Sequence, residues 1–344
     1  MKNWECHKDF RLNGASFQTE ETLLAYADVL SKPVAEFLQE WFSESETISI
    51  KTSGSTGKPK WIKLQKEHMI NSARVTGDFF ELGAGIKALL CLPIDYIAGK
   101  MMLVRAMYLG WHLDVVPSSS KPLAGLDREY DFSAMIPLQL KNSLEAIGAV
   151  KKLIVGGGAV DHKLENELQS ISTSIYATYG MTETCTHVAI KKLNHSKWDS
   201  FKALKDVVIS KDSRGCLIID APSVSNEQII TNDVVEIISD DTFDWKGRYD
   251  NVINSGGIKL HPEEIEKKIA PYLNDRFFVA GIKDQALGEK LVLVVEGEAS
   301  KTSESIYRDL TKYEIPKNIF FIKKFEETET QKIQRKKTLH KINA

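Results

Sequence analysis

The nine residues Thr52-Ser-Gly-Ser-Thr-Gly-Lys-Pro-Lys60 directly follow the segment Thr47–Lys51, whose alternating pattern predicts a strand. Two glycines allow a tight backbone that can approach an anion closely, and successive backbone N–H groups can form an anion-binding nest. By composition the loop is either a polyphosphate cradle or a flexible surface loop, and its place directly after a strand favours the cradle. The candidate phosphate-binding residues are Thr52, Ser53, Gly54, Ser55, Thr56, Gly57, Lys58 and Lys60.

The spacing of this loop disfavours a P-loop NTPase. That motif needs four residues between its glycines and a Ser or Thr after the lysine. Here two residues separate Gly54 from Gly57, and Pro59 follows Lys58. Pro59 also disfavours a helix that begins directly at Lys58.

Composition places the chain among ordinary globular proteins. It has 344 residues, 42% hydrophobic and 27% charged, with a net charge of −2. This length suggests two or three domains, and the near-neutral balance argues against a general nucleic-acid binder. No apolar run reaches a membrane span, and the N-terminus lacks the apolar core of a signal peptide, so we expect a cytoplasmic protein. The four cysteines are far apart, which disfavours a zinc site or a disulfide framework.

Outward from the loop, predicted strands and helices alternate as far as about residue 187. This alternation predicts a layered α/β fold with a parallel sheet. The predicted helices are Glu20–Leu30, Val34–Phe42, His68–Phe80, Ala98–Leu109, Leu138–Ile147 and Asp161–Leu168. The predicted strands are Trp61–Leu64, Ala88–Leu92, His112–Val116, Phe132–Ile136, Lys152–Val155 and Ser174–Thr178.

The pattern changes after about residue 187. Short strands at close spacing, among them Gln228–Ile230 and Val234–Ile238, predict a small, mostly antiparallel region. A last segment holds an acidic helix that begins at Pro262 and a predicted helix at Ser303–Tyr313. We predict a large N-terminal domain at residues 1–248 and a small mobile α+β domain at residues 249–344.

Further motifs follow the loop in order along the chain. They are Tyr179-Gly-Met-Thr-Glu-Thr184, an aspartate at Asp233, Gly247-Arg-Tyr-Asp-Asn-Val-Ile-Asn-Ser-Gly-Gly-Ile-Lys259 with Pro262-Glu-Glu-Ile-Glu266, and Thr328-Glu-Thr-Gln-Lys-Ile-Gln-Arg335. Together with the loop, this series closely resembles the adenylate-forming (AMP-binding) superfamily, which includes acyl-CoA synthetases, adenylation domains and firefly luciferase. One motif matches easily by chance, but the ordered series does not.

Within this superfamily the chain is most similar to the o-succinylbenzoate–CoA ligases of menaquinone biosynthesis. Tyr179–Cys185 and the segment Arg214–Pro222 carry this similarity. The resemblance implies an AMP-forming acid–thiol ligase that uses ATP, Mg²⁺ and coenzyme A. A carboxylate attacks the α-phosphate of ATP, and because two anions must meet, catalysis depends on charge neutralisation and positioning.

The resemblance also assigns roles to individual residues. Lys332 and Thr182 would contact the reacting groups, and Glu183 would hold Mg²⁺ through a hard oxygen ligand. Gly157, Gly158, Ala159, Tyr179, Gly180, Asp233 and Arg248 would bind adenine and ribose, and Gly156 and Thr178 would line the acyl pocket. Asp250 would be the hinge, and Gly256 and Gly257 would face coenzyme A.

Several positions depart from the family pattern. Tyr96 stands where a histidine is usual and could close the acyl pocket, and Lys100, one helical turn later, is a candidate partner for a second carboxylate. Gln331 replaces the usual glycine before Lys332. Only about 50 residues precede the phosphate loop. One wall of the acid pocket could therefore be reduced or supplied by a second subunit of a homodimer.

Two alternatives to this function remain. One is a ligase for another acyl or aryl acid, and the other is a nucleotide-binding protein without ligase activity. Several residues also have ordinary interpretations: Lys332 lies in a basic tail, and the three glycines from Gly156 could form a plain turn. The order of the motifs, rather than any single residue, carries the functional interpretation.

Overall fold

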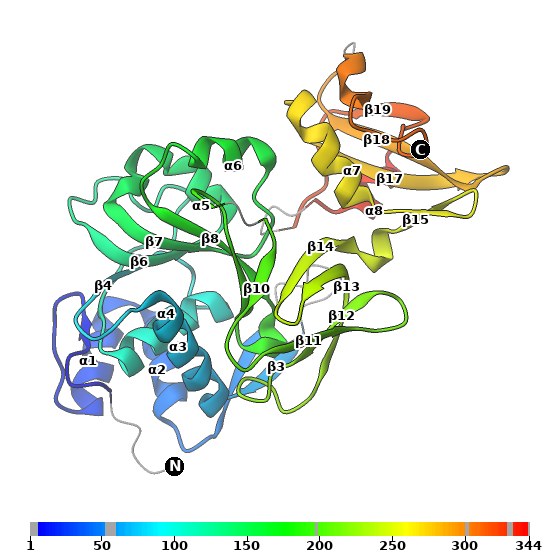
Figure 1. The fold of residues 1–344 in the computed structure, drawn as a ribbon. Coiled ribbons are helices and arrows are strands. Elements are labelled where there is room, and N and C mark those ends of the chain that lie inside the picture. The colour runs from blue at the N-terminus through cyan, green and yellow to red at the C-terminus, as the bar shows by residue number, and fades with distance from the viewer. Residues whose placement is uncertain (1–5, 52–59, 197–198, 300–302, 329–332, 343–344) are drawn as a thin grey trace. The chain divides into compact units, whose positions relative to one another are not determined.

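The computed structural model describes residues 6–51, 60–196, 199–299, 303–328 and 333–342. The chain divides into two compact units (Figure 1). The first unit comprises Met1–Val160, Leu168–Ile209 and Ile219–Ile229, and the second comprises Asp161–Glu167, Ser210–Ile218 and Ile230–Ala344. The domain boundary at residue 248 stays a prediction.

Most of the described α-helices fall close to predicted ones, and α8 was not predicted. The described helices are α1 (Glu20–Leu30), α2 (Lys32–Phe42), α3 (Lys66–Phe80), α4 (Ile97–Leu109), α5 (Pro137–Asn142), α6 (His162–Leu168), α7 (Pro262–Ile269) and α8 (Arg335–His340). Local sequence sets their ends. Thr19 caps α1, Gly110 ends α4 with a φ of 74°, and prolines stand in the first turns of α2, α5 and α7.

The first unit is built on a sheet with the strand order β1-β5-β4-β6-β7-β8-β9-β10. Neighbours from β1 to β8 pair in parallel, as predicted, and β9 and β10 continue antiparallel. The strands are β1 (Arg11–Leu12), β4 (Lys87–Leu90), β5 (His112–Val115), β6 (Tyr130–Met135), β7 (Val150–Val155), β8 (Ser174–Gly180), β9 (His187–Lys192) and β10 (Phe201–Ala203). A separate hairpin pairs β2 (Thr47–Lys51) with β3 (Trp61–Gln65).

An aromatic cluster joins the helices of the first unit to its sheet. The Phe132 ring on β6 lies 5.4 Å from the ring of Trp111 and 5.5 Å from that of Phe80. Phe80, at the end of α3, also meets Tyr176 of β8 edge-on at 5.0 Å. Such offset and edge-on pairs are favourable beyond the area they bury. Helices α3 and α4 pack against each other (Figure 1).

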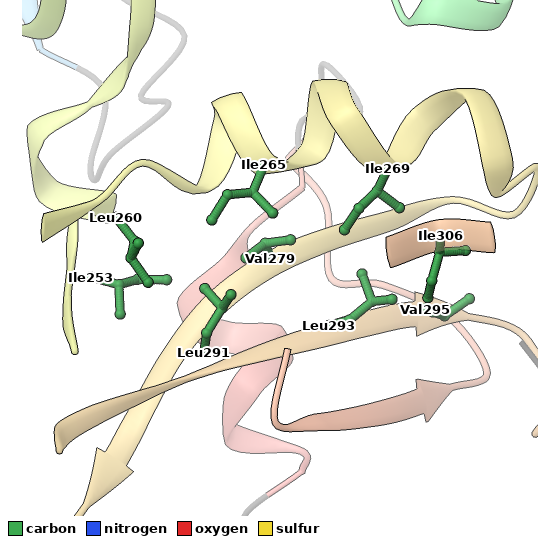
Figure 2. Close-up of a cluster of buried hydrophobic side chains, with 9 residues drawn as sticks. All are labelled: Ile253, Leu260, Ile265, Ile269, Val279, Leu291, Leu293, Val295 and Ile306. Carbon is green, nitrogen blue, oxygen red and sulfur yellow. The ribbon is translucent and has the colours of Figure 1, made fainter. Parts of the chain in front are cut away.

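The second unit holds β14 (Thr242–Arg248), β13 (Ile229–Ser239), β12 (Cys216–Asp220) and β11 (Val208–Lys211) as neighbours, with part of β11 to β13 counted in the first unit. Its other sheet contains β15 (Ile253–Ser255), β16 (Ile258–Leu260), β17 (Phe277–Asp284), β18 (Gly288–Glu296) and β19 (Asn318–Ile322). Figure 2 shows Ile265 and Ile269 of α7 pointing onto Val279, Leu291 and Leu293 of this sheet. These buried aliphatic side chains form the core of that layer.

Two predicted helices are wrong in part. The segment predicted as one helix at 138–147 is α5 followed by a 3-10 helix at Leu144–Ala149, and Ser143 breaks the regular geometry with φ −115° and ψ 9°. Asparagine and serine are weaker helix formers than leucine, which favours a break at Asn142 and Ser143. The segment predicted at 303–313 contains only the 3-10 helix Glu304–Tyr307. Beyond it the Glu314 carboxylate accepts from the Thr311 N–H at 2.8 Å, which favours a turn.

The two strands predicted on either side of residues 231–233 form the single strand β13. Residues 231–233 belong to the continuous strand β13, in which Asp233 lies opposite Arg248 of β14. The pairing of β13 with β14 shifts in register between Val234 and Val235, as at a β-bulge. In the part of the chain that the structure describes, no helix is both long enough and apolar enough to cross a membrane.

Candidate functional site

The predicted glycine-rich segment and the predicted motif at Tyr179–Thr184 lie at the carboxyl ends of β7 and β8. These strands pair in parallel with Val155 opposite Ala177, so the segments that follow them emerge at the same edge of the sheet. The Thr178 hydroxyl donates to the Val155 carbonyl at 3.1 Å. A Cβ at Gly156 would lie 2.7 Å from Thr178 Oγ1. The structure therefore brings Gly156 and Thr178 into contact, and Gly157, Gly158 and Ala159 follow them as exposed residues.

A tightly wound turn at residues 180–187, called here the 180–187 turn, follows β8. A Cβ at Gly180 would lie 2.0 Å from the Thr186 carbonyl oxygen, so only glycine fits this position. The Thr184 hydroxyl accepts from the Met181 N–H at 3.0 Å and lies 2.6 Å from the Thr186 carbonyl oxygen. Cys185 takes the left-handed φ of 58°, which is uncommon for a residue with a side chain. The turn is thus fixed by its own hydrogen bonds.

This turn presents Thr182 and Glu183, which lie in the 3-10 helix Thr182–Thr184. Thr182 is half-buried, and Glu183 is exposed. Within the described ranges, no three His, Cys, Asp or Glu side chains gather into a metal-binding group. Glu183 alone offers the hard oxygen that Mg²⁺ prefers, so phosphate oxygens and water would have to complete its coordination. The donor type fits the metal that the resemblance implies.

The predicted ribose-binding pair lies in the second unit. Asp233 is only 7% exposed, and its Oδ1 accepts from Arg248 Nη1 at 3.4 Å and from Trp245 Nε1 at 3.0 Å. The β13–β14 register places Asp233 opposite Arg248, which explains their proximity. Trp245 was not among the residues predicted from the sequence. Its only signal was the alternation of β14, which puts Trp245 on a strand paired with the aspartate strand.

The predicted hinge residue Asp250 follows β14 and is exposed. Arg248 Nη2 lies 3.8 Å from an Asp250 carboxylate oxygen, and the Asn232 amide approaches the same oxygen at 3.5 Å. Gly256 and Gly257 connect β15 to β16 with φ values of 59° and 83°. Two positive φ values in a two-residue hairpin turn are typical of type I′, which strongly favours glycine.

Tyr96 and Lys100 lie at the start of α4. Tyr96 is the half-buried N-cap residue, and its carbonyl accepts the first helical hydrogen bond, from the Lys100 N–H at 3.2 Å. Lys100 is buried, with its Nζ 4.5 Å from the ring centroid of Phe37 on α2. Burial lowers the pKa of Lys100, while Glu40, Asp95 and Glu36 oppose that change.

Two predicted groups lie outside the described residues. These are residues 52–59 of the phosphate loop and the segment that includes Gln331 and Lys332. Lys60, at the end of the loop, is described and exposed. The roles assigned to these residues stay predictions.

A surface hollow of about 440 Å³ lies at the opposite ends of the parallel strands. Lys87, His112 and Tyr130, at the starts of β4, β5 and β6, contribute to its lining. None of the predicted site residues that the structure describes lines this hollow. In parallel α/β sheets ligands bind at the carboxyl ends of strands, which favours the glycine-rich segment and the 180–187 turn as the site.

The family profile described as AMP-binding enzyme matches residues 15–206, more than half of the chain. The chain belongs to the AMP-binding enzyme family. Its activity class is that of the adenylate-forming carboxylate–CoA ligases, the AMP-forming acyl-CoA synthetases.

Individual relatives support the same assignment. A solved structure described as an acyl-CoA synthetase (AMP-forming)/AMP-acid ligase II-like protein from Dyadobacter fermentans is 38% identical, covers 91% of this chain and 95% of that one, and has a TM-score of 0.61. A 2-succinylbenzoate–CoA ligase from Bacillus mycoides is 26% identical over 93% of this chain and 76% of that protein. The Bacillus subtilis o-succinylbenzoate coenzyme A synthetase, solved with ATP and magnesium, shares the fold at 19% identity, with a TM-score of 0.74 and coverages of 94% and 82%.

Proposed function

We propose that this chain joins o-succinylbenzoate to coenzyme A through an acyl-adenylate, with ATP and Mg²⁺. The observation that carries the proposal is the 180–187 turn, which presents Thr182 and an exposed Glu183 directly after β8, the parallel neighbour of the strand β7 that runs into the glycine-rich segment. The acid is proposed from the 2-succinylbenzoate–CoA ligases among the relatives, of which two are 26% and 25% identical. The menaquinone pathway follows from that choice of acid.

The reaction would proceed in two balanced steps. A carboxylate oxygen of the acid attacks the α-phosphorus of ATP, and the bond between this phosphorus and the bridging oxygen breaks to release pyrophosphate. The coenzyme A thiolate then attacks the acyl carbonyl carbon, and AMP leaves with the oxygen that the acid supplied. The thiol proton passes to solvent or base. Both steps bring anions together, so positioned donors and cations supply most of the catalysis.

Each described residue has a proposed task in this scheme. Thr182 would donate to the α-phosphate, and Glu183 would hold Mg²⁺, which neutralises phosphate charge when bound. In the second unit, Asp233 would accept from the ribose hydroxyls while Arg248 and Trp245 fix its carboxylate. Lys332 and the residues of the phosphate loop would contact the acid and the β- and γ-phosphates. Asp250 would serve as the hinge between the two steps, with Gly256 and Gly257 facing coenzyme A.

The second carboxylate of o-succinylbenzoate needs a cation or donor of its own. We propose Lys100 for this task, since it is buried on the first turn of α4 beside the half-buried Tyr96. Within the described residues, no carboxylate oxygen lies within ion-pair distance of its ammonium group, so an acid could take that place. Unchanged affinity for o-succinylbenzoate in Lys100→Ala would remove this assignment.

The test is acid-dependent pyrophosphate release with ATP, Mg²⁺ and coenzyme A. The acids offered are o-succinylbenzoate, benzoate, acetate and a medium-chain fatty acid. We expect release with o-succinylbenzoate and its loss in Lys332→Ala. Preference for another acid would contradict o-succinylbenzoate as the substrate and would still agree with an AMP-forming acyl-CoA synthetase. Binding of ATP without release for any acid would contradict ligase activity and favour a nucleotide-binding protein.

We also propose a cytoplasmic location. All four cysteines are free, which fits a reducing compartment. A homodimer in which a second copy completes the acyl pocket stays a prediction, and sedimentation of the purified chain would test it.

A further inference from the structure

Arg105 is a charged side chain deep inside the first unit that the proposed chemistry does not use. It lies on α4 and is 1% exposed. Its Nε donates to Thr76 Oγ1 at 3.3 Å, and its Nη2 donates to Thr186 Oγ1 at 3.2 Å. Its Nη1 lies 3.8 Å from the sulfur of Met102. All these partners are neutral.

No carboxylate among the described residues pairs with Arg105. Burial lowers the pKa of Arg105 to about 9, so the side chain still carries its charge at neutral pH. The neighbouring His187 is held neutral, because burial, and then the charge of Arg105, lower its pKa well below the ordinary value. A buried charge without a counter-charge costs stability. Such a residue is a candidate for a role other than stabilisation.

The hydrogen bonds of Arg105 lead to the 180–187 turn. Thr186 Oγ1, which accepts from Arg105, also bonds to Ser72 Oγ of α3 at 2.9 Å. The backbone of Thr186 in turn holds Thr184, because its carbonyl oxygen lies 2.6 Å from the Thr184 hydroxyl. The same hydroxyl fixes Met181 directly before Thr182. An unbroken series of bonds therefore connects Arg105 to the turn that presents Thr182 and Glu183.

We propose that Arg105 is a positioning residue that holds the 180–187 turn in the geometry needed for acid activation. This inference rests on the proposed function, because Thr182 and Glu183 act only if the chain forms an adenylate. The guanidinium suits this task since its rigid fork reaches two hydroxyls on different elements at once. Displacing a catalytic group by about 1 Å can cost about 100-fold in rate.

A purely structural role and a positioning role for Arg105 predict different effects of its removal on stability. If Arg105 mainly stabilised the fold, its removal would unfold the first unit. If it positions the turn at a cost, an apolar side chain of similar length would leave stability unchanged or raise it, because Thr76 and Thr186 keep other hydroxyl and carbonyl partners. Activity and stability should therefore move independently.

The experiment compares Arg105→Met, Arg105→Lys and Arg74→Met in the full chain. Arg74 is a matched control, because it is an exposed arginine on α3 that contacts the neighbouring Tyr108 at 2.7 Å. For each variant we would measure melting temperature, kcat and KM for acid-dependent pyrophosphate release, and the Mg²⁺ concentration for half-maximal rate. Wild-type release with any of the acids offered establishes the activity on which the test depends.

We expect Arg105→Met to melt at or above the wild-type temperature and to lose about 100-fold in kcat. Its Mg²⁺ requirement should rise, because Glu183 is displaced. Arg105→Lys should recover part of kcat, and Arg74→Met should match the wild type. Wild-type kcat and Mg²⁺ dependence in Arg105→Met would overturn the inference and leave the proposed function intact. A lower melting temperature with unchanged kcat per folded molecule would also overturn it, as would wild-type kcat in Thr186→Val, which lacks the hydroxyl that Arg105 bonds.

Discussion

Two arginines, one in each unit, show opposite solutions to holding a guanidinium away from water. Arg105 in the first unit donates to hydroxyls and a sulfur atom and meets no carboxylate within the described ranges. Arg335 in the second unit lies 2.7 Å from a Glu266 oxygen and 3.5 Å from one of Glu263. It also donates to the Val279 carbonyl at 3.0 Å. Its side chain is 22% exposed, whereas Arg105 is 1% exposed.

This comparison suggests that the charge of Arg335 stabilises the fold and that the charge of Arg105 serves the function. Arg335 is the first residue of α8 and connects this helix to α7 and β17. The carboxylates of Glu263 and Glu266 balance its positive charge. Arg105 is buried more deeply with less compensation, and its bonds lead to the 180–187 turn. Removing Arg335 should therefore lower the stability of the protein, whereas removing Arg105 should leave it unchanged or raise it.

The largest expected effect is the loss of stability in Arg335→Met. This change leaves Glu266 and the buried Glu263 without their cation, and breaking such a pair costs about 3 kcal/mol. Chemical unfolding of Arg335→Met, Arg105→Met and wild type would measure it. Lys336→Met serves as the matched control, because Lys336 is exposed beside Arg335. Equal losses in the two arginine variants would break the comparison.

The next effect concerns the backbone of the 180–187 turn. Gly180→Ala places a Cβ 2.0 Å from the Thr186 carbonyl, which cannot move aside as a side chain can. We expect about 2 kcal/mol of destabilisation and a kcat loss of about 100-fold. Gly148→Ala is the control, because a Cβ there meets nothing within 4 Å. Normal pyrophosphate release by Gly180→Ala would show that the turn geometry does not govern the reaction.

A smaller effect follows from the pH dependence of stability. The pKa of His187 is lowered in the folded state, first by burial and then by Arg105, so below pH 6.5 the unfolded chain binds a proton that the folded chain does not. Stability should therefore fall as the pH drops through 6.5, by about 1.4 kcal/mol at pH 5.5. Unfolding at pH 7.5 and 5.5 should show a smaller fall in His187→Gln than in the wild type. Identical falls would contradict a neutral His187 beside an unpaired Arg105.

The smallest effect tests the carboxylate of the second unit. Trp245→Phe keeps an aromatic ring and removes the N–H that donates to Asp233. We expect a loss of about 1 kcal/mol in stability and a few-fold rise in the KM for ATP. An unchanged KM would indicate that Asp233 does not depend on Trp245 for its orientation.

The strands and helices that position the site could be predicted because their patterns are local. The apolar runs of β4, β6 and β7 appear in the sequence as short-range signals. The prediction at 138–147 failed because Ser143 forms a break that periodicity does not show. The 303–313 prediction failed because a side-chain bond from Glu314 favours a turn.

The buried polar network could not be predicted from the sequence. Arg105 lies in the largely apolar stretch Met101–Val116, but its partners Thr76 and Thr186 are distant in sequence and meet it only in the folded chain. The tight contact of Gly180 with Thr186 likewise depends on the path of the whole turn. The order of the motifs predicted the candidate site residues, and the structure adds the contacts that hold the 180–187 turn in place.

The most direct test of acid activation follows the oxygen that the acid donates. The acid, labelled with ¹⁸O in both oxygens of the activated carboxylate, is turned over with ATP, Mg²⁺ and coenzyme A, and the nucleotide and phosphate products are analysed by mass spectrometry. Adenylate formation predicts that each AMP carries one ¹⁸O and that pyrophosphate carries none. Labelled inorganic phosphate together with ADP would instead show attack at the γ-phosphorus, and would contradict the account.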